Sequence, residues 1–416
     1  MRGRPGALLA IVLAAAGCVE RVAAPGTCPA YCPSAGLTVL DTLLVTNVSK
    51  DSAYRGYVLA YQAAVMLVSD TPLVDSRAIF QFSSYGPRIA IRTNDTTTSA
   101  IPSLDSAQLR FYVTHRDTAA HNLTVRIYGL PVPIDTLTPF ATVAGPFAAA
   151  PLRRVNLDSL FARAGHKDSV AGDSVQADTV NNRWLVFLRL DSSQAHYVVA
   201  DTGRLAYGVR VSANRFASAT LGKGDLGPQF TPFTTLDSAG TPVRRTLPVR
   251  GATVATFVFD PPPRPLDSTL AVGGVPATRS ILRIALPRAL RDSTQVMRAT
   301  LILVPAVAAR GAPADSFVIE AHTVLTDFGA KSPIAVDLTR VDTTVIHIGA
   351  TDTTQIEITN LLQFWQTDTT QVTTLVLTAK PEANDLAEIR FYPSQAAGLR
   401  PAIRVTYVPR YPFGKP

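Results

Sequence analysis

The sequence predicts an all-β protein made of two tandem antiparallel β-sandwiches with short helical turns. The chain of 416 residues is long enough for two or three domains that each bury a hydrophobic core. Its strand-forming residues, above all Val and Thr, occur in short apolar runs that end at Pro, Gly or Asp-Ser/Thr pairs. The order of these runs in the first half recurs in the second half. Two copies of one sandwich are therefore expected.

The first residues read as a signal sequence. Residues 1–17 combine Arg2 and Arg4 with a short apolar stretch and then small residues before Cys18. The apolar stretch is too short for a stable membrane-spanning helix. The run AAGC at 15–18 resembles the cleavage box of bacterial lipoproteins. The resemblance implies that Cys18 is lipidated and anchors an exported protein to a bacterial membrane, in particular the outer membrane, on its periplasmic or surface face.

Two cysteines remain once Cys18 is assigned to the anchor. Cys28 and Cys32 lie in residues 18–36, a stretch rich in Pro and Gly that suits a tether. In the oxidising compartment that a leader implies, these two cysteines are expected to form a local disulfide. Metal binding is the alternative, but two sulfurs without a neighbouring His make an incomplete zinc site.

Residues 37–237 form the predicted first sandwich. In the segment 108–113, Leu109, Phe111 and Val113 share one face, and the alternate residues share the other. This alternation predicts a strand with one face in the core and the other wet or partly covered.

The segment 152–180 is more polar than the rest of the first half. Asn156 or Asp158 is expected to cap one short helix over Leu157, Leu160 and Phe161, since both side chains can accept backbone hydrogen bonds at a helix start. The remainder reads as a long exposed loop.

Asp-Ser and Asp-Thr pairs recur along the chain, for example at Asp105, Asp117, Asp135, Asp191 and Asp292. A calcium loop needs several carboxylates converging in one loop, and no Asp-x-Asp-x-Asp run occurs. The pairs are therefore predicted to form turns in which the side chain bonds the backbone two residues on.

Residues 238–251 are the predicted linker, residues 252–409 the second sandwich and residues 410–416 a tail. Four segments of the two halves match in order and rough spacing, which supports the repeat. The matched segments are 77–82 with 279–284, 107–111 with 299–303, 209–213 with 375–379, and 228–232 with 401–405.

The second half carries RSILRI at 279–284, ATLIL at 299–303, IEITNLLQFW at 356–365 and RPAIRVTY at 400–407. In this order these segments resemble the DNRLRE-type module of bacterial exported proteins. The resemblance implies a jelly-roll β-sandwich that is not catalytic, of a kind associated in some members with polysaccharide binding. The first half carries a fainter copy, in which residues 155–161 match the segment that ends in Trp365, without its Trp.

Trp365 and Tyr392 are the candidate ligand-binding residues, because aromatic rings can stack on sugar rings. Leu361, Leu362 and Trp365 fall on one face of a short helix that Thr359 or Asn360 would cap, and this spacing equally predicts that Trp365 closes the end of the sandwich core.

Metal sites are weakly indicated. Asp385 and Glu388 belong to the most acidic loop of the second half, where calcium is conceivable, but a solvated loop is the simpler interpretation without a spaced series of ligands. His115 and His121 flank a predicted hairpin turn, with no third ligand near them in the sequence. No cofactor is otherwise predicted.

The formal charge is +8, but the arginines are scattered through strands and loops, so nucleic-acid binding is not expected. Weak attraction to anionic membranes or acidic polysaccharide is the alternative that this charge suggests. No nucleophile elbow, zinc-binding helix motif or phosphate loop occurs, so an enzyme is not predicted. The leading hypothesis is a lipid-anchored envelope protein with non-catalytic binding or adhesive modules, for polysaccharide in particular. The alternatives are a structural subunit that braces another envelope protein and, third, a glycan-active enzyme whose carboxylates are brought together by folding.

Overall fold

The computed structural model describes residues 38–410, apart from 57, 73, 84–87, 92–95, 97, 101–103, 132, 165–171, 196–204, 261–265, 312 and 328–332. Cys18, Cys28 and Cys32, with the predicted leader and tether, therefore lie outside the described residues. So does the predicted tail beyond Arg410. Within the described residues, no helix is long and apolar enough to cross a membrane.

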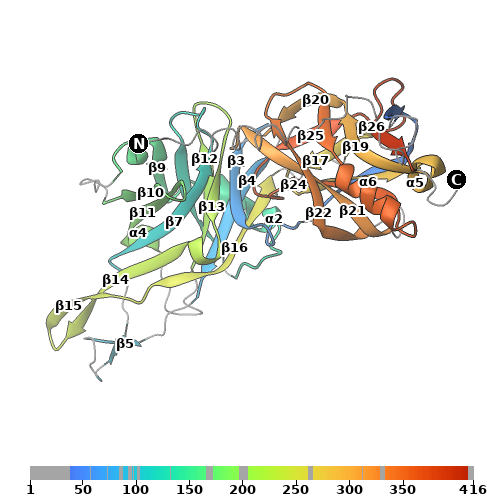
Figure 1. Ribbon diagram of the computed structural model, residues 1–416. Coiled ribbons are helices and arrows are strands. Elements are labelled where there is room, and N and C mark those ends of the chain that lie inside the picture. Colours follow the sequence, from blue (N-terminus) through green and yellow to red (C-terminus); the bar gives the residue numbers. More distant parts are fainter. Residues whose placement is uncertain are drawn as a thin grey trace, which may run out of the picture. The chain divides into compact units, whose positions relative to one another are not determined.

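Short strands in antiparallel pairs make up most of the described chain, which confirms the predicted all-β sandwich class (Figure 1). The first sheet runs in the order β10-β11-β7-β13-β3-β4-β12-β8-β9, and β14 also pairs with β7, β15 and β16. Its strands are β3 (Val65–Asp70), β4 (Asp75–Phe82), β7 (Ser106–Arg116), β8 (Thr124–Leu130), β9 (Arg153–Asn156), β10 (Ser174–Asp178), β11 (Arg183–Asp191), β12 (Leu205–Ser212), β13 (Ala217–Gly222), β14 (Gln229–Ser238), β15 (Thr241–Thr246) and β16 (Arg250–Asp260). A separate pair consists of β5 (Arg88–Ala90) and β6 (Thr98–Ala100).

The pairings of the first sheet close a ring. β7 pairs with β13, β13 with β3, β3 with β4, β4 with β16, β16 with β14, and β14 again with β7. The sheet therefore folds over on itself around a core that includes Leu109, Phe111 and Phe230, which are all 0% exposed. The predicted alternation in 108–113 is confirmed, because the residues expected to face inward are the buried ones.

A four-stranded and an eight-stranded sheet form the second sandwich. Residues of both sheets share one core, for example Leu301 and Val405 from the first of these with Ile319 and Leu375 from the second. The four-stranded sheet has the order β1 (Leu40–Leu44), β26 (Ala402–Pro409), β19 (Thr294–Leu303), β23 (Thr354–Glu357). The larger sheet has the order β20 (Pro305–Arg310), β25 (Glu388–Phe391), β17 (Leu270–Gly273), β18 (Thr278–Ile284), β24 (Thr374–Lys380), β21 (Ser316–Asp327), β22 (Pro333–His347), with β2 (Val48–Arg55) beside β18.

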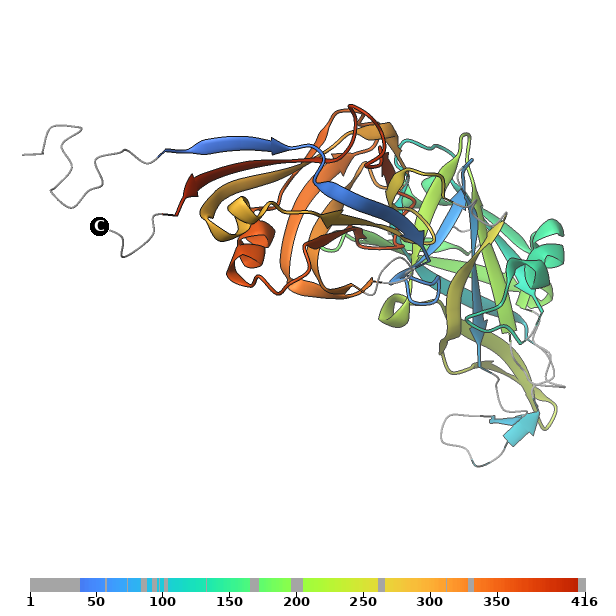
Figure 2. The ribbon, with the colours of Figure 1, turned by 90° about the vertical axis from the view of Figure 1, so that its right-hand side faces the viewer.

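Strand pairing differs from the predicted division of the chain at 238–251. β1 and β2 were expected in the first sandwich but pair with β26 and β18, and Figure 2 shows these blue strands among the orange and red ones. Conversely, β16 was expected to open the second sandwich but pairs with β4 and β14. An exposed strand edge is satisfied by any antiparallel strand that reaches it, whatever its place in the chain. β16 thus lies beside β4 as β2 lies beside β18.

The four matched segments fall on strands with equivalent partners. β4 pairs with β12 as β18 pairs with β24, and β7 pairs with β14 as β19 pairs with β26. The counterpart of β23 and the helix after it is β11 followed by α4 (Ser192–Ala195), because β11 pairs with β7 as β23 pairs with β19. The predicted match of 155–161 to the Trp365 segment is therefore wrong. Sequence spacing predicted the wrong segment, because additional strands precede β11 in the first half and shift the equivalent segment to a later position in the chain.

The segment 152–180 contains more structure than predicted. The short helix is present as α3 (Leu157–Phe161), and Asn156 caps it by accepting a hydrogen bond from the Ser159 backbone N–H at 3.0 Å. The Asp158 carboxylate instead accepts from Arg116 and from the Leu123 backbone N–H. The stretch expected as loop includes the strand β10, which pairs with β11.

Asx-type turns explain several of the Asp-Ser and Asp-Thr pairs. The carboxylates of Asp117, Asp135 and Asp191 each accept a hydrogen bond from a backbone N–H two or three residues on, namely Ala119 (2.9 Å), Leu137 (2.8 Å) and Gln194 (3.0 Å). Asp105 departs from the prediction, since its carboxylate accepts from the distant Thr235 hydroxyl at 2.7 Å.

Helix α2 (Phe140–Ala148) covers the outer face of β4, β12 and β8. Val143 and Phe147 pack there against Ile79 and Tyr128. Gly208 on β12 allows this approach, because an added Cβ would lie 2.5 Å from Phe147 Cζ. Helix α2 was not predicted from the sequence.

Candidate functional site

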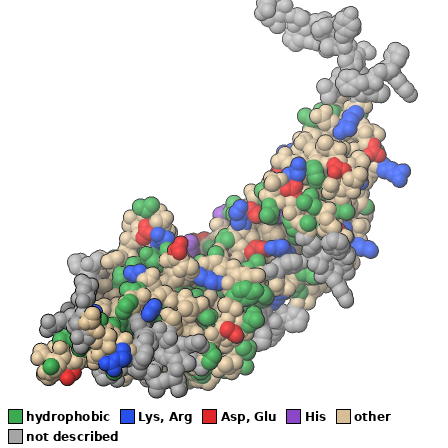
Figure 3. Space-filling view, turned by 90° about the horizontal axis from the view of Figure 1, so that it is seen from below, with side chains coloured by type: hydrophobic (Ala, Val, Ile, Leu, Met, Phe, Trp, Pro, Cys, Tyr) green, Lys and Arg blue, Asp and Glu red, His purple; other side chains and the backbone are tan. Residues whose placement is uncertain are grey.

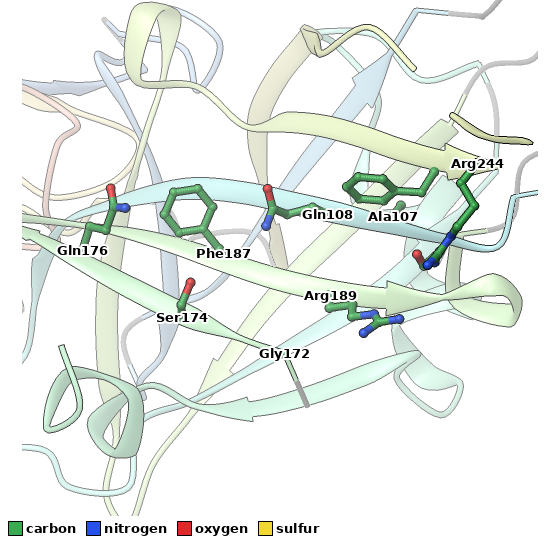
Figure 4. Close-up of a pocket in the computed structure, with 10 residues that line it drawn as sticks. Ala107, Gln108, Gly172, Ser174, Gln176, Phe187, Arg189 and Arg244 are labelled. Atoms are coloured by element: carbon green, nitrogen blue, oxygen red, sulfur yellow. The ribbon is translucent and has the colours of Figure 1, made fainter. Parts of the chain in front are cut away.

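An open groove lies on the outer face of β10, β11, β7 and β14, with β15 at one end (Figure 4). Its volume is about 460 Å³. The lining residues are Ser106, Ala107, Gln108, Gly172, Ser174, Gln176, Phe187, Arg189, Phe233 and Arg244. In Figure 4, Gln176 lies at one end, Arg189 and Arg244 lie at the other, and Phe187 and Gln108 lie between them.

Strand alternation places these side chains. On β11, Val186 and Leu188 are 0% exposed, so the residues between and beyond them, Phe187 and Arg189, face outward. The register puts Phe187 opposite Arg110 and Arg189 opposite Gln108. The outward side chains of neighbouring strands thereby form one continuous surface.

The two other flanks of the groove come from strands that are distant in the sequence. β10 places Ser174 opposite Phe187, and β14 places Phe233 opposite Ser106. β15 folds back on β14 and contributes Arg244, which is paired in register with Thr235.

Gly172 lies beneath the Arg189 side chain. Its φ is +73°, and an added Cβ would lie 3.0 Å from Arg189 Cδ. A residue with a side chain would be strained at this φ and would crowd the arginine. Gly172 therefore leaves room for Arg189 at the end of the groove.

The described lining of the groove offers contacts for binding. Among these lining residues none is Asp, Glu, His or Cys. The two aromatic rings offer flat apolar contact, while Gln and Arg side chains offer hydrogen-bond donors and acceptors. Such a surface can hold an extended polar ligand.

The carboxylates that border the groove are engaged locally. Asp178 accepts from Asn181 and from Arg183 Nε, the latter at 2.6 Å, and these bonds, with Asn181 foremost, lower its pKa. Asp191 accepts from the Ser193 hydroxyl at 2.6 Å, which lowers its pKa. Both carboxylates stay ionised and are held by their own turns.

A smaller cavity of about 220 Å³ lies on the second sandwich and contains two carboxylates. Glu320 accepts from Lys380 Nζ at 2.6 Å and is 3.2 Å from His322 Nε2. Glu382 receives both Nε and Nη2 of Arg279, at 2.7 and 2.6 Å. Both carboxylates are held in ion pairs, as expected for structural groups on a sheet surface.

Trp365 is not a ligand platform in this structure. It lies on α6 (Thr359–Thr367), is 0% exposed, and its indole N–H donates to the Thr323 hydroxyl at 2.9 Å. Leu361 and Leu362 are buried beside it. The proposed ligand-binding role of Trp365 is therefore wrong, and its alternative role in closing the core holds. Tyr392 is half-buried directly after β25, and its ligand-binding role stays a prediction.

The calcium candidates Asp385 and Glu388 are each engaged by other groups of the chain. Within the described residues, no group of three or more His, Cys, Asp or Glu is placed to hold a metal ion, and His115 and His121 belong to none. Asp385 accepts from the Ala387 backbone N–H at 2.9 Å, and burial raises its pKa to about 6. Glu388 contacts three arginines, which would repel a cation.

Comparisons with known proteins leave the family open. No protein-family model and no curated protein matches the chain. A solved structure with weak similarity is the C-terminal domain of the Streptococcus pyogenes antigen I/II-family protein AspA, with 10% identity over 84% of this chain and 92% of that chain. The TM-score is 0.15, so this likeness carries no argument about fold or function.

The sequence alone does not identify the groove, although part of its signal is visible there. Phe187 and Arg189 alternate with buried apolar residues on β11, and an aromatic residue on an outward face is such a signal. The strands that complete the groove could not be recognised, because β10 was expected to be loop and β15 was expected to be linker.

Proposed function

We propose that this chain is a lipid-anchored protein of a bacterial envelope and that its first sandwich binds a glycan chain without catalysis. The observation that carries the binding role is the open groove, in which Phe187 and Phe233 lie among amide and guanidinium side chains. Sugar rings have apolar C–H faces that pack on aromatic rings, and their hydroxyls pair with amides.

On one face of the molecule, the cationic side chains lack the arrangement that nucleic acid needs. On the face shown in Figure 3, Lys and Arg are interspersed with acidic and other side chains rather than gathered into one stripe. A nucleic-acid surface would need such a stripe, with aromatic residues interleaved.

Replacing Phe187 or Phe233 by Ala is expected to weaken glycan binding about tenfold each, because each change removes a ring from the groove. The measurement is equilibrium binding of the detergent-solubilised full-length protein to immobilised neutral and acidic polysaccharides. Phe216→Ala is the matched control, since Phe216 is 60% exposed and does not line the groove. Circular dichroism checks that each variant is folded. Absence of binding to every polysaccharide would remove this function and favour a structural subunit.

The anchor is tested separately from the groove. Cys18→Ala is expected to abolish incorporation of a fatty-acid analogue in growing bacteria, because lipidation requires the thiol at that position. Cys28→Ala, which leaves the box at 15–18 intact, is expected to keep full incorporation. Labelling that persists in Cys18→Ala would show that the chain is not anchored in this way.

A further inference from the structure

We infer that the groove selects an acidic polysaccharide, a glycan whose sugars carry carboxylates. This inference rests on the proposed glycan-binding function and names the class of glycan. Its basis is the set of arginines on the groove face, the state of the nearby carboxylates, and the contrast with the equivalent face of the second sandwich.

Three guanidiniums on this face have no carboxylate partner among the residues that the structure describes. Arg189 and Arg244 line the groove, and Arg110 lies on the same face, opposite Phe187. None of the three forms an ion pair with a carboxylate of the described chain. Arg189 is opposite Gln108, two residues along β7 from Arg110, so the two arginine backbones are about 8 Å apart by strand geometry.

The described carboxylates on and beside this face have other partners, including Asp173, which pairs with Arg153. Asp178 is paired with Arg183, and Asp191 is held by Ser193 and the Gln194 backbone N–H. The Asp105 carboxylate accepts from Thr235. The groove face therefore carries a local excess of positive charge beside flat aromatic rings.

The equivalent face of the second sandwich provides an internal comparison. β19, β26 and β23 occupy there the places of β7, β14 and β11. Its arginines are paired, Arg298 with Glu357 at 2.9 Å and Arg404 with Asp41 at 3.9 Å. The hollow on that face is about 100 Å³ and no aromatic residue lines it. The same strand arrangement therefore carries paired arginines in the second sandwich. The groove face differs from it in its unpaired arginines and in its aromatic rings.

Guanidinium groups suit carboxylates for a geometric reason. The planar fork of arginine donates two parallel hydrogen bonds to the two oxygens of a carboxylate, which a neutral hydroxyl cannot accept in the same way. Two such groups at one end of a groove with a flat apolar floor can hold the carboxylate of a uronate while its ring packs on Phe187. Arg189 and Arg244 are exposed, which keeps the cost of desolvating them small.

The test compares polymers that differ in charge. Detergent-solubilised full-length protein is titrated with three uronate polymers, polygalacturonate, alginate and hyaluronate, with fully methyl-esterified polygalacturonate, and with the neutral polymers dextran and arabinoxylan. Wild-type protein is expected to bind at least one uronate polymer about tenfold or more tightly than the ester and the neutral polymers. The double variant Arg189→Gln, Arg244→Gln is expected to lose this preference. The matched control Arg298→Gln, Arg404→Gln, on the second sandwich, is expected to keep it.

The outcomes separate this inference from the proposed function. Equal binding of charged and neutral polymers, or a preference that survives in Arg189→Gln, Arg244→Gln, overturns acidic selectivity but leaves glycan binding intact. Binding to none of the polymers overturns both. Polyacrylate, a polyanion without sugar rings, distinguishes a further case: if it binds as tightly as the best uronate polymer and Phe187→Ala has no effect, the face attracts polyanions in general and the inference is wrong.

Discussion

Replacing Trp365 by alanine is expected to lower the free energy of unfolding of the second sandwich by about 3–5 kcal/mol. The change leaves a cavity at a fully buried site and removes the largest buried side chain of α6, together with its hydrogen bond to Thr323. The measurement is chemical denaturation followed by far-ultraviolet circular dichroism, which does not depend on the removed fluorophore.

Trp184 provides the matched control for this change. It is half-buried at the start of β11 and stacks on Phe161 with ring centroids 4.6 Å apart. Trp184→Ala is expected to cost less than Trp365→Ala, because the site is open to solvent and can relax. A loss of stability in Trp365→Ala no greater than in Trp184→Ala would contradict the assignment of Trp365 to the core. Trp365→Phe, which keeps most of the ring volume, is expected to bind glycan as the wild type does.

The sequence predicts local structure here better than it predicts partners. Period-two alternation identifies Leu109, Phe111 and Val113 as buried, because the direction of a side chain is a local property of an extended strand. The choice of neighbouring strand is not local. β2 and β16 each have a strand pattern. Their pairing with β18 and β4 in the folded sheets places each of them in the other sandwich from the one expected.

The same limit explains why the groove was missed. Phe187 and Arg189 are visible as outward residues on one strand, whereas the groove also requires Phe233 and Arg244 from a hairpin more than forty residues later in the chain. An aromatic residue in a recognisable motif, Trp365, was the more visible candidate, but its helical spacing predicted burial equally well. The Trp365 motif in this chain therefore identifies a residue of the sandwich core. The groove becomes visible only from the pairing of strands in the folded protein.

Replacing Glu388 by glutamine is expected to lower the free energy of unfolding of the second sandwich by about 3 kcal/mol. The Glu388 carboxylate accepts from Arg390 Nε at 2.7 Å and from Arg310 at 3.3 Å, and it lies 3.6 Å from Arg55 Nη2. The side chain is only 10% exposed, so solvent replaces little of the lost interaction. Removal of its charge leaves three guanidiniums close together with Asp267 as the remaining carboxylate that contacts Arg390.

Asp267→Asn is the matched control for Glu388→Gln. Asp267 contacts the same Arg390 at 2.9 Å, but its side chain is 53% exposed, so its loss is expected to cost less than about 1 kcal/mol. Adding Arg310→Gln to Glu388→Gln is expected to restore part of the stability, because it removes one of the uncompensated charges. Denaturant titrations of the four proteins at neutral pH give these differences. Equal stability losses in Glu388→Gln and Asp267→Asn would show that the cluster is screened like an exposed pair. Calcium added to the wild type is expected to leave its unfolding midpoint unchanged, because the arginines already occupy the Glu388 carboxylate.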